Sequence, residues 1–240
     1  MNRFFDLPSD LQHSWFGLIG LHLREALLPV LAGLLVSLPV AQLCVRFRWL
    51  YPPVLGLTTV LYAIPSLAFF VVLIDYTGQT ELTVMIPLAV YSLVVLVPAI
   101  VDGVRSVPQE TLAAATAMGL GPVRRYFQVQ LPIAVPAIVA GLRVATVSSI
   151  SLVSVGMLIG NQGALGNLLN DANIYHRPEL AVNSVVTTAA LAILADAALV
   201  LVRLVLTPWM PRGTRRVRRA RAATARPEPA AQPVLEDAVR

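Results

Sequence analysis

Few ionisable side chains fall inside the apolar runs of the sequence, and these are the first candidates for chemistry. Asp196 and Arg203 both lie in the apolar run 183–206, seven residues apart, so a helix would place them on one face. An ionisable residue within a membrane span often belongs to an ion or proton pathway, which would make Asp196 the proton relay of a secondary transporter. The favoured interpretation is structural: the long side chain of Arg203 extends until its guanidinium group reaches the membrane interface, and Asp196 faces another helix.

Serine residues form the second group of interest, within the apolar run 132–157. They are Ser148, Ser149, Ser151 and Ser154. Small polar side chains let helices approach closely in membranes, and their hydroxyl groups can also line a path for a solute. Ser148 and Ser151 are therefore candidates for the translocation pathway or, as the more common role, for helix packing.

Residues for catalysis, metal binding or ATP hydrolysis are not arranged in the required patterns. Cys44 is the single cysteine, and His13, His22 and His176 are too far apart for metal-ligand spacing. Paired carboxylates and Cys–His pairs are also lacking near the membrane interfaces. A Walker A motif needs a lysine, and the sequence has none. We therefore expect no enzyme activity, no cofactor and no metal, and a membrane enzyme is the weakest of the functional alternatives.

The composition indicates an integral membrane protein built of helices. Hydrophobic residues make up 57% of the 240 residues and charged residues 13%, whereas soluble domains carry about 25% charged residues; mean hydropathy is +0.73. About 20 apolar residues cross a bilayer as a helix. Five runs meet or approach this length: 25–44, 54–74, 82–101, 132–157 and 183–206. A sixth crossing would arise if 52–74, which contains Pro65, or 144–160 were broken.

Arginine residues in the connections predict the orientation in the membrane. The basic connections are 45–53, 102–131 and the segment after 206. The acidic or nearly neutral connections are 75–81 and 158–182. Basic loops stay in the cytoplasm, so we expect the N-terminus outside and the C-terminus inside, with Arg3 and Arg24 as exceptions. The arginine cluster near the C-terminus is interpreted as a juxtamembrane anchor rather than a nucleic-acid arm.

The connection 102–131 has the most informative local pattern. Pro108 can start a helix, and Glu110 in its first turn suits the helix dipole. Residues 113–117 favour a helix of little bulk, Gly119 can end it, and Pro122 can begin a second, basic and aromatic helix. The pattern predicts either a smooth helix–turn–helix surface for close contact with another protein, or an ordinary alanine-rich loop.

This stretch resembles the EAA signature of binding-protein-dependent ABC permeases, which is EAA, three residues, Gly, nine residues, Ile, one residue and Leu-Pro. The matching positions are Ala114, Ala115, Gly119, Val129 in place of Ile, Leu131 and Pro132. Ala113 stands where the signature has Glu, and Glu110, about one turn earlier, is a candidate to replace it. The resemblance implies an ATPase-coupling loop that contains Glu110, Ala113, Ala114, Ala115, Gly119, Arg124, Arg125, Leu131 and Pro132.

Other segments are similar to the osmoprotectant branch of these permeases, which imports glycine betaine, choline or carnitine. They are Ile64-Pro65-Ser66-Leu67-Ala68, Tyr91-Ser92-Leu93 with Ile100 and Gly103, Gly141-Leu142-Arg143, and Gly163-Ala164-Leu165-Gly166. The resemblance covers roughly residues 20–205. Methionine-importer permeases share the five-span core and a similar loop, so a permease for methionine or another amino acid is the alternative.

The resemblance also implies a fold and a set of partners. The fold is all-α, with five or six transmembrane helices in a type I ABC importer permease (MetI-like) core at 20–206. An extracytoplasmic segment at 1–19 precedes this core, and a basic, disordered cytoplasmic tail at 207–240 follows it. The implied partners are a cytoplasmic ABC ATPase dimer, a second permease subunit of the same or a sister chain, and an extracytoplasmic solute-binding protein. The expected location is the lipid bilayer of the bacterial inner membrane, with no nucleic acid bound.

Overall fold

The computed structural model describes residues 9–159 and 164–209, with side chains from Trp15 onward. Gly163 and the basic tail from residue 210 fall outside these residues. The helices are α1 (Ser9–Arg46), η1 (Arg48–Leu50), α2 (Tyr51–Ala63), α3 (Ser66–Thr77), α4 (Glu81–Arg105), α5 (Gln109–Ala117), α6 (Pro122–Arg125), η2 (Tyr126–Gln130), α7 (Leu131–Val155), η3 (Gly156–Ile159), α8 (Asn167–Ile174) and α9 (Pro178–Leu206). Helix α1 begins within the predicted N-terminal segment 1–19.

The long apolar helices of the described residues form up to five candidate membrane spans. Four are single helical stretches: Trp15–Arg46, Glu81–Arg105, Pro122–Ile159 and Pro178–Leu206. The fifth is the pair Arg48–Ala63 and Ser66–Thr77, bent by 89°. The prediction of an all-α membrane fold is confirmed, and the four single helices with the bent pair agree with the predicted five spans. The break in the second span adds no sixth crossing, and residues 144–159 continue one span, so the described residues hold at most five.

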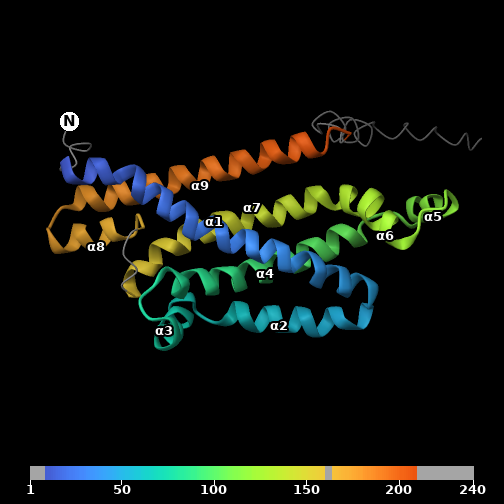
Figure 1. The fold of residues 1–240 in the computed structure, drawn as a ribbon, viewed down its shortest axis with the longest axis horizontal. Helices are drawn as coiled ribbons and strands as arrows, with labels where there is room; N and C mark the ends of the chain where they lie inside the picture. The colour runs from blue at the N-terminus through green and yellow to red at the C-terminus, as the bar shows by residue number, and fades with distance from the viewer. Residues whose placement is uncertain (1–8, 160–163, 210–240) are drawn as a thin grey trace, which may run out of the picture. The chain divides into compact units, whose positions relative to one another are not determined.

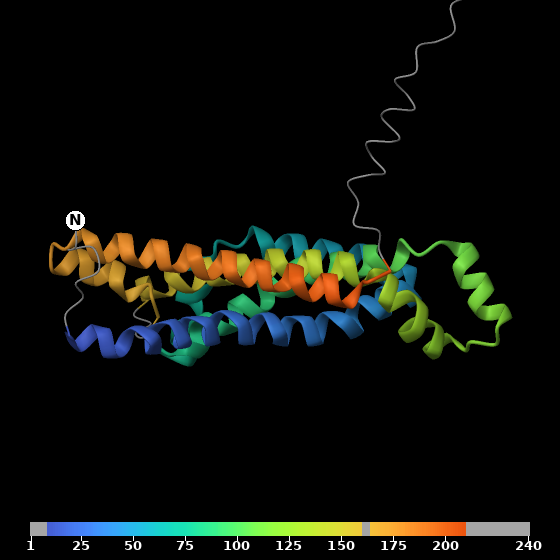
Figure 2. The ribbon, with the colours of Figure 1, turned by 90° about the horizontal axis from the view of Figure 1, so that it is seen from above.

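The long helices α1, α4, α7 and α9 lie side by side, and α2 lies against α4 (Figures 1 and 2). Helices α5 and α6 project at one end, called here the loop end, where α1, α4 and α9 finish with Arg46, Arg105 and Arg203 in their last turns. Helix α8 lies at the opposite end. Arg24, an exception to the charge pattern, forms a 3.4 Å ion pair with Glu81.

Pro65 explains the bend between α2 and α3. Proline disfavours the helical conformation of the preceding residue, and Ile64 is extended with φ −71° and ψ 122°. The break leaves the Ile64 carbonyl without a helical partner, which is costly in a bilayer. The Tyr91 hydroxyl of α4 donates a 2.8 Å hydrogen bond to it. Helix α3 is then anchored by Phe70, which is fully buried.

Close helix contacts hold α1, α4 and α7 together. A Cβ atom at Gly33 of α1 would lie 2.6 Å from the Cβ of Ser92 on α4. A Cβ atom at Gly141 of α7 would lie 2.6 Å from the Cβ of Ala99. Such distances are too short for carbon atoms, so glycine is needed where these helices cross, as is common in membrane proteins.

We therefore expect Gly141→Val to destabilise the protein by about 1–3 kcal/mol, the usual cost of overpacking. The valine would push α7 away from α4 at Ala99. The measurement is the melting temperature of the purified protein in detergent. Ala99→Gly, combined with Gly141→Val, should recover part of the loss because it removes the colliding methyl group. A single variant that melts like the native protein would contradict this account.

Candidate functional site

The loop between α4 and α7 begins with a helix that ends in a tight, hydrogen-bonded turn. Helix α5 follows Pro108 and stops before Gly119, whose φ is +79°. The Gly119 N–H donates to the Thr116 carbonyl at 2.9 Å, and the Leu120 N–H donates to the Ala115 carbonyl at 3.1 Å. This pair of bonds is a Schellman motif, which favours glycine at the left-handed position. Of the three central alanines, Ala115 is buried, whereas Ala113 and Ala114 are exposed.

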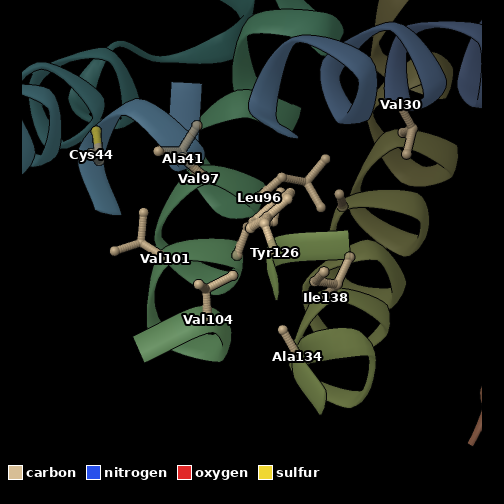
Figure 3. Close-up of a cluster of buried hydrophobic side chains, with 12 residues drawn as sticks. Val30, Ala41, Cys44, Leu96, Val97, Val101, Val104, Tyr126, Ala134 and Ile138 are labelled. Carbon is tan, nitrogen blue, oxygen red and sulfur yellow. The ribbon is translucent and has the colours of Figure 1, made fainter. Parts of the chain in front are cut away.

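The second half of the loop is tied both to α5 and to the bundle core. The Arg125 guanidinium donates a 2.9 Å hydrogen bond to the Thr116 hydroxyl, which joins α6 to α5. Tyr126 is only 7% exposed and belongs to a core cluster with Leu96 and Ala134, where Figure 3 shows its ring between α4 and α7. It begins the π-helical turn η2, a type of distortion that is frequent at functional sites. Movement of the loop would therefore be transmitted to α7.

Exposed apolar side chains mark the surface of this loop. Met118, Val123 and Phe127 are 73%, 68% and 60% exposed. The continuous helical stretch Pro122–Ile159 has 38 residues and measures about 57 Å, against about 30 Å of hydrocarbon. The stretch is therefore longer than one membrane crossing requires. Exposed apolar patches outside a membrane mark contacts with other proteins, and we name Met118, Val123 and Phe127 the apolar loop patch.

The sequence analysis missed the apolar loop patch, although a signal for it exists. These three apolar residues stand in the connection 102–131, between the predicted spans, where an apolar side chain has no bilayer core to enter. The residues predicted for the coupling loop differ in exposure: Glu110, Ala113, Ala114, Gly119 and Arg124 are exposed, Arg125, Leu131 and Pro132 are partly buried, and Ala115 is buried. The loop thus presents glutamate, small residues, arginine and apolar side chains together.

Asp196 pairs with Arg143 of α7. The Arg143 Nε and Nη2 atoms donate to the two Asp196 carboxylate oxygens at 2.6 Å and 2.7 Å. Such a two-pronged contact is the strong geometry for this pair, and each side chain remains about one third exposed, 35% and 32%. The sequence held a signal for this partner, since Arg143 is the single charged residue of the run 132–157.

The serines of α7 take part in helix packing and in the wall of a cavity. Ser149 is buried and its hydroxyl donates a 2.8 Å hydrogen bond to the Ala26 carbonyl of α1. Ser148 and Ser151 are exposed within the chain and line a cavity of about 580 Å³ between the α2–α3 break, α4 and α7. Ser149 also lines this cavity, so one serine serves both helix packing and the cavity wall.

His22 and Cys44 take part in helix packing. His22 is buried, and its Nε2 atom lies 2.9 Å from the Ile150 carbonyl, which links α1 to α7. Cys44 is buried in the core cluster with Tyr126. Across the described residues, no cluster of three or more His, Cys, Asp or Glu side chains is suited to hold a metal ion.

Known permeases are similar to most of this chain. The choline transport system permease protein OpuBB of Bacillus subtilis is 27% identical over 187 residues, 78% of this chain and 86% of that protein. The glycine betaine/carnitine/choline transport system permease protein OpuCD of Bacillus subtilis is 31% identical over 73% of this chain and 76% of that protein. The osmoprotectant import permease protein OsmW of Salmonella typhimurium is 31% identical over 78% and 89%.

Solved structures show the same fold. The inward-facing MetNI methionine ABC transporter matches with a TM-score of 0.75 and 18% identity, over 84% of this chain and all of the matched chain. At this identity the likeness concerns the fold alone. Residues 30–216 match the family model described as binding-protein-dependent transport system inner membrane component. The chain therefore belongs to the family of inner membrane components of binding-protein-dependent transport systems.

Proposed function

We propose that this chain is the permease subunit of an ATP-driven ABC importer for an osmoprotectant such as glycine betaine, choline or carnitine. The observation that carries the proposal is its similarity, over roughly three quarters of its length, to permeases named for these solutes. A permease for methionine is the second candidate, supported by the MetNI fold. The fold is compatible with both solutes, so the higher identity to the osmoprotectant permeases decides between them.

The loop end faces the cytoplasm in this proposal, and the N-terminus lies outside. The support is the grouping of Arg46, Arg105 and Arg203 with the basic loop helix α6, since basic residues flank membrane spans on the cytoplasmic side. The apolar loop patch and Gly119 then form the docking surface for a separate ATPase dimer. A second permease subunit and an extracytoplasmic solute-binding protein, which delivers the solute at the α8 end, complete the importer.

Helix α7 supplies the mechanical link. Closure of the ATPase dimer on ATP would move the coupling loop, and Tyr126 holds that loop in the core between α4 and α7. Helix α7 runs without interruption from Leu131 to Val155 and carries the cavity residues Ser148 and Ser151. A displacement at the loop is thereby transmitted to the centre of the membrane. In this mechanism the chain moves solute, and its partner hydrolyses ATP.

Transport by the complete importer tests the proposal. The chain is reconstituted in proteoliposomes with its ATPase and solute-binding protein, and uptake of labelled choline, glycine betaine, carnitine and methionine is measured. We expect ATP-dependent uptake of the quaternary amines. Uptake of methionine alone would favour the second candidate. Uptake that follows a proton gradient without ATP would contradict the proposal and return Asp196 to the role of a proton relay.

Substitution of the apolar loop patch tests the docking surface. Phe127→Ser should weaken co-purification of the ATPase by about 10-fold, as expected for an aromatic contact worth about 1.4 kcal/mol at an interface. Phe16→Ser is the matched control, because Phe16 is 83% exposed on α1, near the opposite end of the bundle. Equal loss of the ATPase in both variants would argue against this surface.

A further inference from the structure

The break between α2 and α3 opens onto the cavity of about 580 Å³. Ile64, Pro65 and Ser66 of the break line it on one side. Helix α4 contributes Tyr91 and Ser92, and α7 contributes a face that includes Ser148 and Ser151. The volume lies within the roughly 300–1,000 Å³ of small-molecule sites. Interrupted membrane helices are also where transporters place their solute sites.

Two tyrosine rings distinguish this cavity from a simple packing gap. Tyr91 is fixed in place, because its hydroxyl donates to the Ile64 carbonyl at 2.8 Å and its ring meets Phe69 edge to face at 6.0 Å. Tyr62 lines the cavity from the last turn of α2 and is 69% exposed within the chain. Both tyrosines line the same cavity. The remaining polar groups of the wall are serine hydroxyls, and none of the described residues that line it is charged.

The chemistry of this wall selects among cations. A quaternary ammonium group has no N–H to donate, so it needs neither a carboxylate nor a set of hydrogen-bond acceptors. It is attracted to the faces of aromatic rings instead. A primary ammonium group has three N–H donors, and in a low-dielectric site each needs a hydrogen-bond acceptor. An uncharged cavity with two tyrosine rings therefore suits a trimethylammonium group better than the ammonium group of an ordinary amino acid.

We propose that this cavity is a transit site in the membrane for the quaternary ammonium group of the solute, with Tyr62 and Tyr91 as its aromatic wall. The inference rests on the proposed function and deepens it, because it assigns solute selection to the permease as well as to the binding protein. Tyr91 is a fixed wall, and Tyr62, on the helix before the break, closes on the passing cation. Ser148 and Ser151 line the face of α7 that moves with the coupling loop.

Thiol chemistry at Ser148→Cys tests the cavity without relying on transport. The full-length chain is purified in detergent and treated with a methanethiosulfonate that carries a trimethylammonium group, and separately with a neutral methanethiosulfonate of similar size. The native chain serves as the blank, because Cys44 is 1% exposed. We expect a second substitution, Tyr62→Leu, to slow the reaction with the cationic reagent by about 10-fold, the equivalent of about 1.4 kcal/mol. The neutral reagent should react at the same rate with and without Tyr62→Leu. The chain with Tyr62→Phe, which keeps the aromatic ring, should react with the cationic reagent as fast as the chain that retains Tyr62.

Uptake by the reconstituted importer is the second readout. Tyr62→Leu should lower choline uptake about 10-fold while the binding protein still stimulates ATP hydrolysis, and Tyr62→Phe should transport normally. Equal cationic labelling of Ser148→Cys chains with and without the Tyr62→Leu substitution overturns the site. Ring-dependent labelling in an importer that moves no quaternary amine supports the site and rejects the proposed function. Normal uptake by Tyr62→Leu together with ring-independent labelling rejects the site and leaves the proposed function standing.

Discussion

Gly119→Leu is expected to weaken ATPase association by about 30-fold, the equivalent of an interface hot spot of about 2 kcal/mol, and to abolish most uptake. A Cβ atom at Gly119 would meet nothing within 4 Å in the chain itself. The leucine therefore projects outward from the turn, where it would collide with a docked partner. The measurements are co-purification of the ATPase and ATP-dependent uptake, together with the amount of permease in the membrane.

Gly78→Leu is the matched control for the effect of backbone strain. Gly78 has φ +68° against +79° for Gly119, and a Cβ atom there also meets nothing within 4 Å. Gly78 also has ψ −166°, a conformation almost confined to glycine, so a leucine there costs about 1–3 kcal/mol. The strain at Gly78 is therefore at least as large as the penalty of about 1–2 kcal/mol expected for a left-handed leucine at Gly119. Gly78 lies between α3 and α4, near the start of α4 and away from the loop end. If both variants lost uptake equally, strain rather than docking would explain the result.

The second large effect is expected at the ion pair between α7 and α9. Arg143→Leu and Asp196→Leu should each lower the amount of monodisperse protein several-fold. Each single variant leaves one charge facing an apolar bundle and lipid, without the partner that binds it through two hydrogen bonds. Arg143 is halfway along α7, so neither charge is at a helix end. The measurement is the monodisperse fraction in size-exclusion chromatography at equal expression.

The double variant separates a structural ion pair from a proton relay. Arg143→Leu combined with Asp196→Leu removes both charges, so most of the folded protein should return, because breaking such a pair is worse than replacing it. ATP-driven uptake by this variant should also return, since the proposed mechanism moves no proton through Asp196. A double variant that folds but transports nothing would assign Asp196 a direct part in transport.

The sequence was sufficient for features that depend on local composition and backbone conformation. Long apolar runs predicted the spans because a bilayer requires about 20 apolar residues in a helix. The pattern from Pro108 to Pro122 predicted the helix, turn and helix of the loop, because φ +79° at Gly119 strongly favours glycine. Pro65 marked the second span as weak, because proline disfavours the helical conformation of the residue before it. Proline alone did not decide where a span breaks, since other prolines lie inside continuous helices: Pro29, Pro39, Pro87, Pro98 and Pro136.

Tertiary structure alone decided which side chains meet across the bundle. Arg143 and Asp196 are separated by 53 residues and join in one ion pair, and Tyr62, Tyr91 and Ser148 come together around one cavity. These contacts depend on how each helix is rotated about its own axis. In a soluble protein, the sequence of a helix shows its rotation, because one face is apolar and the other polar. Lipid accepts apolar side chains on every face. The sequence of a membrane helix therefore does not show which face meets its neighbours, and that face is determined by helix packing.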